Sequence, residues 1–248
     1  MSKIRLFDIN IDNVSMDQAV NRIDGFISDK SGLKTVFTPN VDHLMMLRKD
    51  REFKDIYNKA DFVIADGMPV VWASHILKKG LKEKVSGIDL VYKLYSLSEN
   101  KGHSVYFLGA REDVMKDAVK KIKKQFPNLK ITGFHSPSFN ITKEENKEMI
   151  SKINSAKPDM LFVGFGAPKQ EIWLYNNKEK LKAKVGIGVG GSFVMISGRF
   201  KRAPKFMQKA GLEWLYRLIQ DPKRLWKRYL RDIKFPFLVA LELAKNKR

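Results

Sequence analysis

Three stretches of this 248-residue chain place glycines directly after an apolar run. They are VYFLGA at 105–110, PDMLFVGFGAPKQEIW at 158–173 and VGIGVGGS at 185–192. A buried strand that ends at glycines and leads into a helix leaves backbone N–H groups free to attract an anion such as a diphosphate. We therefore expect a single rim that binds a phosphorylated ligand, formed by the strand-end glycines and first-turn residues Gly109, Gly164, Gly166, Lys169, Gln170 and Gly190.

Polar residues follow two further strand patterns. Asp66 comes after the apolar run at 62–65 and precedes Gly67. A carboxylate at the carboxyl end of a strand, partly shielded from water, can act as a general base; the alternative is an Asx-turn that closes the strand. Thr38 and Asn40 follow the predicted strand at 33–38, where they either hydrogen-bond a sugar or cap the next helix.

The surrounding elements alternate between strand and helix patterns. This order predicts an α/β fold, with a mostly parallel, Rossmann-like sheet and helices on both faces. In such sheets, ligands bind beyond the carboxyl ends of the strands. The predicted strands cover residues 3–11, 33–38, 62–65, 104–108, 130–134, 160–163 and 184–189. The predicted helices cover 15–28, 41–60, 68–77, 88–98, 113–125 and 143–155, with another starting at 168.

The chain changes character at residue 198. The formal net charge is +20, and residues 199–248 contribute 15 Lys and Arg against 4 Asp and Glu. We predict an α/β core over 1–197 and a basic helical appendage over 198–248, with two helices meeting at Asp221-Pro222. Helical spacing separates two sides of the appendage. One carries Arg217, Arg224, Arg228 and Arg231, and the other carries Leu215, Leu218, Leu225, Trp226, Tyr229 and Ile233.

Such a segment is typical of a helix that lies in a membrane interface. A solvated basic tail and a nucleic-acid-binding protein are the alternatives. The N-terminus lacks a signal-peptide pattern, and no apolar run approaches the ~18 residues of a spanning helix. We therefore expect a cytoplasmic protein, peripheral on the inner face of the membrane.

Several chemistries have no support in the sequence. The chain has no cysteine, no P-loop motif and no Asp-x-Asp, and its four histidines show no metal-ligand spacing. Gly186–Gly191 formally matches G-x-G-x-x-G, but little helix follows it, so a dinucleotide-dependent oxidoreductase is only a distant alternative. We predict neither a metal nor a cofactor.

Taken together, the motifs of this chain resemble those of the WecG/TagA/CpsF family of glycosyltransferases. They occur in family order from about residue 35 onward. They are TPN at 38–40, ADGMPVVWAS at 65–74, VSGIDL at 85–90, FLGA at 107–110, GFGAPKQEIW at 164–173, GVGGSF at 188–193, KRAP at 201–204, and GLEWLYRL followed by PKRLWKRYL.

The resemblance implies an inverting, metal-independent transferase. It would move a sugar, typically N-acetylmannosamine, from a UDP donor to N-acetylglucosamine on undecaprenyl diphosphate, for wall teichoic acid or a related surface polysaccharide. A relative that uses another hexose or a uronic acid as donor is the alternative. The resemblance also implies possible self-association and an appendage that closes over the site and contacts the membrane.

The resemblance also suggests roles for individual residues. Asp66 would be the general base, and Thr38, Asn40 and Gln170 would line the sugar pocket. Lys84 stands where the family often has Arg, and therefore lacks the bidentate fork. Val194 stands where the family commonly has Asp, so no acidic role is expected there. The basic positions of the appendage that match the family are Arg217 and Arg224.

Overall fold

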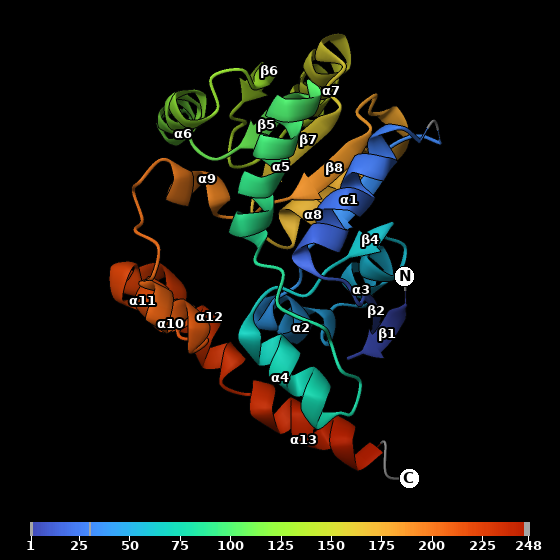
Figure 1. Cartoon of the computed structure of the whole chain (residues 1–248), viewed down its shortest axis with the longest axis vertical. Coiled ribbons are helices and arrows are strands. Elements are labelled where there is room, and N and C mark those ends of the chain that lie inside the picture. Colours follow the sequence, from blue (N-terminus) through green and yellow to red (C-terminus); the bar gives the residue numbers. More distant parts are fainter. Residues whose placement is uncertain (1, 30, 246–248) are drawn as a thin grey trace.

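The computed structural model describes residues 2–29 and 31–245. At its centre lies a six-stranded sheet with the strand order β4-β3-β8-β7-β5-β6 (Figure 1). All neighbouring pairs are parallel, which confirms the predicted α/β fold and brings the carboxyl ends of the strands to one edge. The strands are β3 (Lys34–Phe37), β4 (Phe62–Val63), β5 (Ser104–Gly109), β6 (Lys130–His135), β7 (Met160–Gly164) and β8 (Val185–Gly188).

Both faces of the sheet are covered by helices. Side chains alternate along each strand, so Tyr106 and Leu108 join one apolar cluster while Val105 and Phe107 join the other. The first cluster includes residues of α2 (Val41–Leu47), α3 (Arg51–Asn58), α4 (Met68–Ile76), α7 (Lys143–Ala156) and α8 (Lys169–Asn177). The second includes residues of α1 (Met16–Ile27), α5 (Gly87–Lys101), α6 (Glu112–Gln125) and α9 (Ser192–Ile196).

Two predicted elements are wrong in detail. Residues 3–11 form a hairpin of β1 (Lys3–Leu6) and β2 (Ile9–Asp12), because Phe7 and Asp8 take positive φ angles of 50° and 65° and reverse the chain. The helix predicted over 41–60 is two helices, since the side chain of Asp50 accepts a hydrogen bond from the Phe53 N–H and starts α3 anew. The helix predicted over 15–28 is present as α1, where Ser15 and Gln18 form a capping box.

The appendage consists of α10 (Lys205–Lys209), α11 (Glu213–Gln220), α12 (Pro222–Asp232) and α13 (Phe235–Lys245). The predicted break at Asp221-Pro222 is confirmed. Helix α13 adds Phe235, Leu238 and Val239 to the apolar cluster that also contains the buried face of α4. The appendage therefore packs against the core and runs along one side of the molecule (Figure 1).

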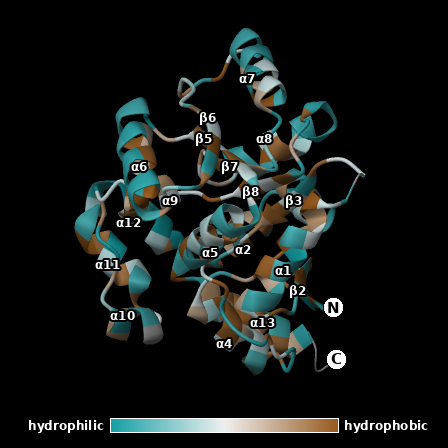
Figure 2. Ribbon diagram, turned by 45° about the horizontal axis from the view of Figure 1, so that its top comes forward, coloured by the Kyte–Doolittle hydropathy of each residue, from teal (hydrophilic) through white to brown (hydrophobic). Residues whose placement is uncertain are grey.

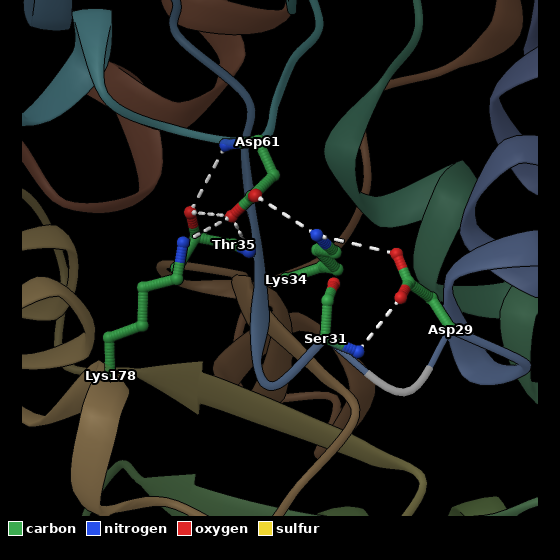
Figure 3. Close-up of polar contacts among 6 residues, drawn as sticks. All are labelled: Asp29, Ser31, Lys34, Thr35, Asp61 and Lys178. Carbon is green, nitrogen blue, oxygen red and sulfur yellow. Dashed lines mark hydrogen bonds and ion pairs between the residues drawn. The ribbon is translucent and has the colours of Figure 1, made fainter.

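A polar cluster connects β3 to the start of β4 at the amino ends of these strands (Figure 3). Asp61, just before β4, accepts hydrogen bonds from the N–H and hydroxyl of Thr35 at 2.9 and 3.0 Å. Lys178 donates to the same carboxylate at 2.8 Å. Burial alone would raise the pKa of Asp61, but the hydrogen bonds from Lys178 and Thr35 outweigh it and hold the pKa below its ordinary value.

Candidate active site

The three glycine-ended strands lie side by side. Gly109 of β5 is in register with Gly164 of β7, and Val163 of β7 is in register with Gly188 of β8. A Cβ atom on Gly109 would lie 2.8 Å from the Gly164 carbonyl carbon. The φ angle of Gly109 is 112°, a value that residues other than glycine rarely adopt. The three strand ends therefore form one rim at the carboxyl ends of the strands, and glycine is required where the turns of β5 and β7 approach each other. Binding of a phosphorylated ligand at this rim stays a prediction.

Gln170 connects two of these turns. Its Oε1 accepts hydrogen bonds from the N–H groups of Gly166 at 3.2 Å and Gly190 at 2.9 Å, and its Nε2 donates to Glu171 at 2.9 Å. The side chain is buried. Two of the amides expected to face a ligand are therefore occupied by Gln170 in this structure. Contact between Gln170 and a sugar stays a prediction, and would require these hydrogen bonds to exchange.

Asp66 and Thr38 converge on the start of α5. A Cβ atom placed on Gly87 would lie 3.3 Å from Thr38 Oγ1 and 3.6 Å from Asp66 Oδ2. The backbone N–H of Asp66 donates to the Pro39 carbonyl at 2.9 Å, which joins the ends of β3 and β4. The two polar side chains predicted from separate strand ends are thus neighbours on the carboxyl rim, although Asp66 lies two strands from β8.

The environment of Asp66 favours a protonated carboxyl more than water does. Burial raises its pKa, and Glu213 adds to the shift by repulsion. The charges of Arg217 and Lys84 and a hydrogen bond from the Gly87 N–H oppose the shift without cancelling it. A carboxylate that is desolvated and incompletely paired can accept a proton more readily than one in water.

The appendage supplies two of the charges around Asp66, Glu213 and Arg217, and the core supplies Lys84. Glu213 of α11 forms an ion pair with Lys84, with 2.9 Å between Nζ and Oε2. Arg217, one turn further along α11, is exposed, and its guanidinium lies 3.3 Å from Met195 Sδ in α9, just after β8. Arg217 therefore contacts α9, the helix that follows the glycine turn of β8, while its charge acts on Asp66.

Helix α12 is held to α2 by buried charge. Asn40 caps α2 through a hydrogen bond from the His43 N–H, which supports the capping alternative for this residue; its predicted sugar contact is untested. Asp42 in the first turn is buried and pairs with Arg228, with 2.9 Å between Nε and Oδ2, and with Arg231. We call Asp42, Arg228 and Arg231 the α2–α12 clasp.

Two further predicted residues lie apart from Asp66. Lys169 is exposed beside the glycine turn of β7, with its Nζ 3.7 Å from the centroid of the Phe139 ring. Arg224 pairs with Asp221 of its own segment at 2.5 Å, and its side chain is 67% exposed. The structure does not bring Arg224 to the rim.

Sequence reasoning missed two residues here. Phe139 is 85% exposed at the rim, and its isolation in a polar loop (HSPSFN) was the available signal. Glu213 was visible as one of only four acids in the basic segment 199–248. In the described ranges, 2–29 and 31–245, there is no group of three or more His, Asp or Glu able to hold a metal ion. No helix of that part of the chain has the length and hydrophobicity to cross a membrane.

Glycine turns at the carboxyl ends of parallel strands are the place where many α/β proteins bind phosphorylated ligands. The model of the glycosyl transferase WecG/TagA/CpsF family matches residues 4–248. This chain therefore belongs to the glycosyl transferase WecG/TagA/CpsF family, which confirms the predicted glycosyltransferase class.

Individual relatives agree with the family match. A protein of Bacillus subtilis (strain 168) is 35% identical over 223 residues, covering 90% of this chain and 84% of its own length. A protein of Staphylococcus aureus (strain MW2) is 31% identical over 248 residues, covering 100% of this chain and 94% of its own. Both are named N-acetylglucosaminyldiphosphoundecaprenol N-acetyl-beta-D-mannosaminyltransferase.

Proposed function

We propose that this protein transfers N-acetylmannosamine from a UDP donor to N-acetylglucosamine linked to undecaprenyl diphosphate. The names of the relatives in Bacillus subtilis and Staphylococcus aureus support the transferred sugar and the acceptor. The observation that carries the proposal is Asp66, a carboxylate with a raised pKa on the same sheet edge as the glycine turns.

The reaction begins with the acceptor hydroxyl beside Asp66. This carboxylate takes the hydroxyl proton while the oxygen bonds to the anomeric carbon of the donor, and the bond from that carbon to the UDP oxygen breaks. Attack from the face opposite the leaving group inverts the anomeric configuration. A positioned base contributes typically ~10²–10⁴-fold to such a step.

The departing UDP needs cations at the rim. The charge of Arg217 acts on Asp66, and its guanidinium contacts α9, which follows the β8 turn. Lys169 follows the β7 turn and is exposed, so both cations are available to receive the diphosphate. Lys84 is close enough to act on Asp66 but is paired with Glu213, which limits its free charge. The exposed ring of Phe139 beside Lys169 is available to stack against the nucleobase. No metal step is part of this mechanism.

We infer that the enzyme works on the inner face of the cell membrane, because its proposed acceptor is linked to a lipid. The basic appendage 198–248 supplies the contact, since each Lys or Arg near an anionic leaflet contributes ~1 kcal/mol. The alternative donor, another hexose or a uronic acid, is favoured by one departure from the family pattern, Val194 in the position that is commonly Asp.

A product assay tests the proposal. Purified protein is incubated with a panel of UDP-sugars and a synthetic prenyl-diphosphate-N-acetylglucosamine, and the products are weighed by mass spectrometry with and without a chelator. We expect a lipid-linked disaccharide from UDP-N-acetylmannosamine in both conditions. A product from another donor would reassign the sugar, and the absence of product from every donor would overturn the proposal.

A further inference from the structure

Helix α4 exposes an apolar face directly beside the reacting carboxylate. It begins two residues after Asp66, and its sequence MPVVWASHI contains no Asp, Glu, Lys or Arg. Trp72 is 46% exposed and Ile76 is 54% exposed. Met68, Trp72 and Ile76 recur every four residues, so they form one stripe about 12 Å long on the helix surface. We call these three residues the α4 stripe.

The α4 stripe is unusual for the core. Among the described residues up to 197, four large apolar side chains are exposed, and two of them belong to this stripe; the others are Phe134 and Phe139. The appendage carries the remaining exposed large apolar residues, namely Phe206, Leu212, Trp214, Ile219, Trp226, Leu230, Ile233 and Phe237. In this property α4 resembles the appendage more than the domain to which it belongs.

The stripe is continuous with the appendage. Gly211, in the turn between α10 and α11, is so close that a Cβ atom there would lie 2.7 Å from the Trp72 ring and 3.2 Å from Met68 Cβ. On the other side α13 packs against α4 and leaves Phe237 67% exposed. Both views place α4 beside α13 at the end of the molecule away from α7 (Figures 1 and 2).

The orientation of α12 indicates what lies outside this surface. A helix on a soluble protein normally turns its apolar side inward. Here Arg228 and Arg231 face the buried Asp42, while Trp226, Leu230 and Ile233 are 47%, 54% and 71% exposed. An outward-facing apolar side of α12 would be stable against an apolar medium such as the interior of a bilayer. Exposed lysines border the surface, Lys78 and Lys79 after α4 and Lys234 before α13, and their charge is complementary to anionic lipid headgroups.

We propose that the α4 stripe inserts into an anionic lipid bilayer together with the appendage, so that the core itself holds Asp66 at the membrane surface. The occupant is the bilayer, and the partner chemistry is acyl chains beneath anionic headgroups. This inference rests on the proposed function for its lipid-linked acceptor. It differs from attachment by the appendage alone, in which Trp72 and Ile76 would remain in water.

Brominated lipids locate Trp72 directly. In the full chain, Trp173→Phe, Trp214→Phe and Trp226→Phe leave Trp72 as the single tryptophan. Vesicles of phosphatidylcholine and phosphatidylglycerol with brominated acyl chains should quench its fluorescence. A matched variant that keeps only the buried Trp173 should be quenched far less. Co-sedimentation of the Trp72-only protein with vesicles, without quenching, would overturn the proposal.

A charge substitution tests the stripe in the otherwise unchanged chain. Ile76→Glu should weaken vesicle binding roughly tenfold or more, because burial of an Ile side chain is lost and a charge is added. Phe134→Glu adds the same charge to an exposed apolar residue on β6 and should bind as the unsubstituted protein does. Unchanged vesicle binding by Ile76→Glu would overturn the proposal.

Two further outcomes are distinguishable. If light scattering shows a dimer that Ile76→Glu dissociates while vesicle binding is unchanged, the stripe binds a second copy of the chain and the proposal is wrong. Vesicle binding is measured without substrates. An inactive protein whose Trp72 is quenched would therefore contradict the proposed function and leave this inference intact.

Discussion

Two aspartates flank the short strand β4, and their surroundings are opposite. Asp61, at the amino edge, receives hydrogen bonds from Thr35 and Lys178, and its pKa is lowered (Figure 3). Asp66, at the carboxyl edge, is desolvated and its pKa is raised. The comparison separates a structural carboxylate, whose charge is satisfied, from one whose charge is poorly satisfied and that is available for proton transfer.

Replacing each of the two aspartates by asparagine gives the strongest test of the difference between Asp66 and Asp61. Asp66→Asn should lower kcat by ~10²–10⁴-fold, because the amide cannot take the acceptor proton. The affinity for UDP, measured by calorimetry, should be nearly unchanged. Asp61→Asn is the matched control and should keep its turnover at a temperature where it is folded. Equal losses of kcat in the two variants would contradict a catalytic role for Asp66 that Asp61 does not share.

Arg217 should produce the next largest effect. Arg217→Gln removes a cation whose charge acts on Asp66 and whose guanidinium contacts α9 after the β8 turn. We expect kcat to fall on the order of 10²-fold, as for loss of a preorganised donor to a developing anion. Arg199→Gln is a matched control in the same segment, since Arg199 pairs with Asp113 on α6. Comparable activity of the two variants would show that Arg217 does not contribute to catalysis.

The α2–α12 clasp should give a smaller effect. Asp42→Asn should weaken docking of α12 by about 2 kcal/mol, a value reduced from that of a fully buried pair because the arginines are partly exposed. Hydrogen exchange in residues 213–232 should speed up. Arg231→Gln should act non-additively with Asp42→Asn, whereas Glu242→Gln, which breaks a pair within α13, should leave exchange there unchanged.

Asp61 should affect stability rather than catalysis, and by the least. Asp61→Asn should lower the free energy of unfolding by about 1.5 kcal/mol, since hydrogen bonds to a charged acceptor are lost. Because the folded-state pKa is lowered, the stabilisation by Asp61 is present above its unfolded pKa and is lost as pH falls through the folded value. Urea unfolding of both proteins at neutral and acidic pH measures the difference. An equal difference at all pH values would contradict this assignment.

Local signals predicted the parts of this molecule that depend on local physics. Glycines after apolar runs located the ends of β5, β7 and β8, and the helical pattern over 15–28 located α1. The turn at Phe7 and Asp8 escaped prediction because neither residue usually takes a positive φ. Capping at Asp50 was overlooked within a continuous helical pattern.

Tertiary contacts were beyond sequence reasoning. Helical periodicity placed Arg228 and Arg231 on one side of α12, but nothing local indicated that this side faces a buried aspartate 189 residues away from Arg231. The position of the Gln170 side-chain amide likewise depends on tertiary contacts, because its oxygen accepts hydrogen bonds from two turns that follow different strands. Which face of a helix turns inward depends on what the neighbouring elements offer, and spacing along the chain does not contain that information.

The pH dependence of kcat/KM tests the role of Asp66 most directly, because this parameter reports ionisations of the free enzyme. A base works in its ionised form, so a raised pKa predicts that the rate falls as pH is lowered, with a midpoint above the ordinary value of 3.8. The residual activity of Asp66→Asn should lack this limb. A wild-type rate that is level down to that value, or the same limb in Asp66→Asn, would contradict the assignment of Asp66 as the base.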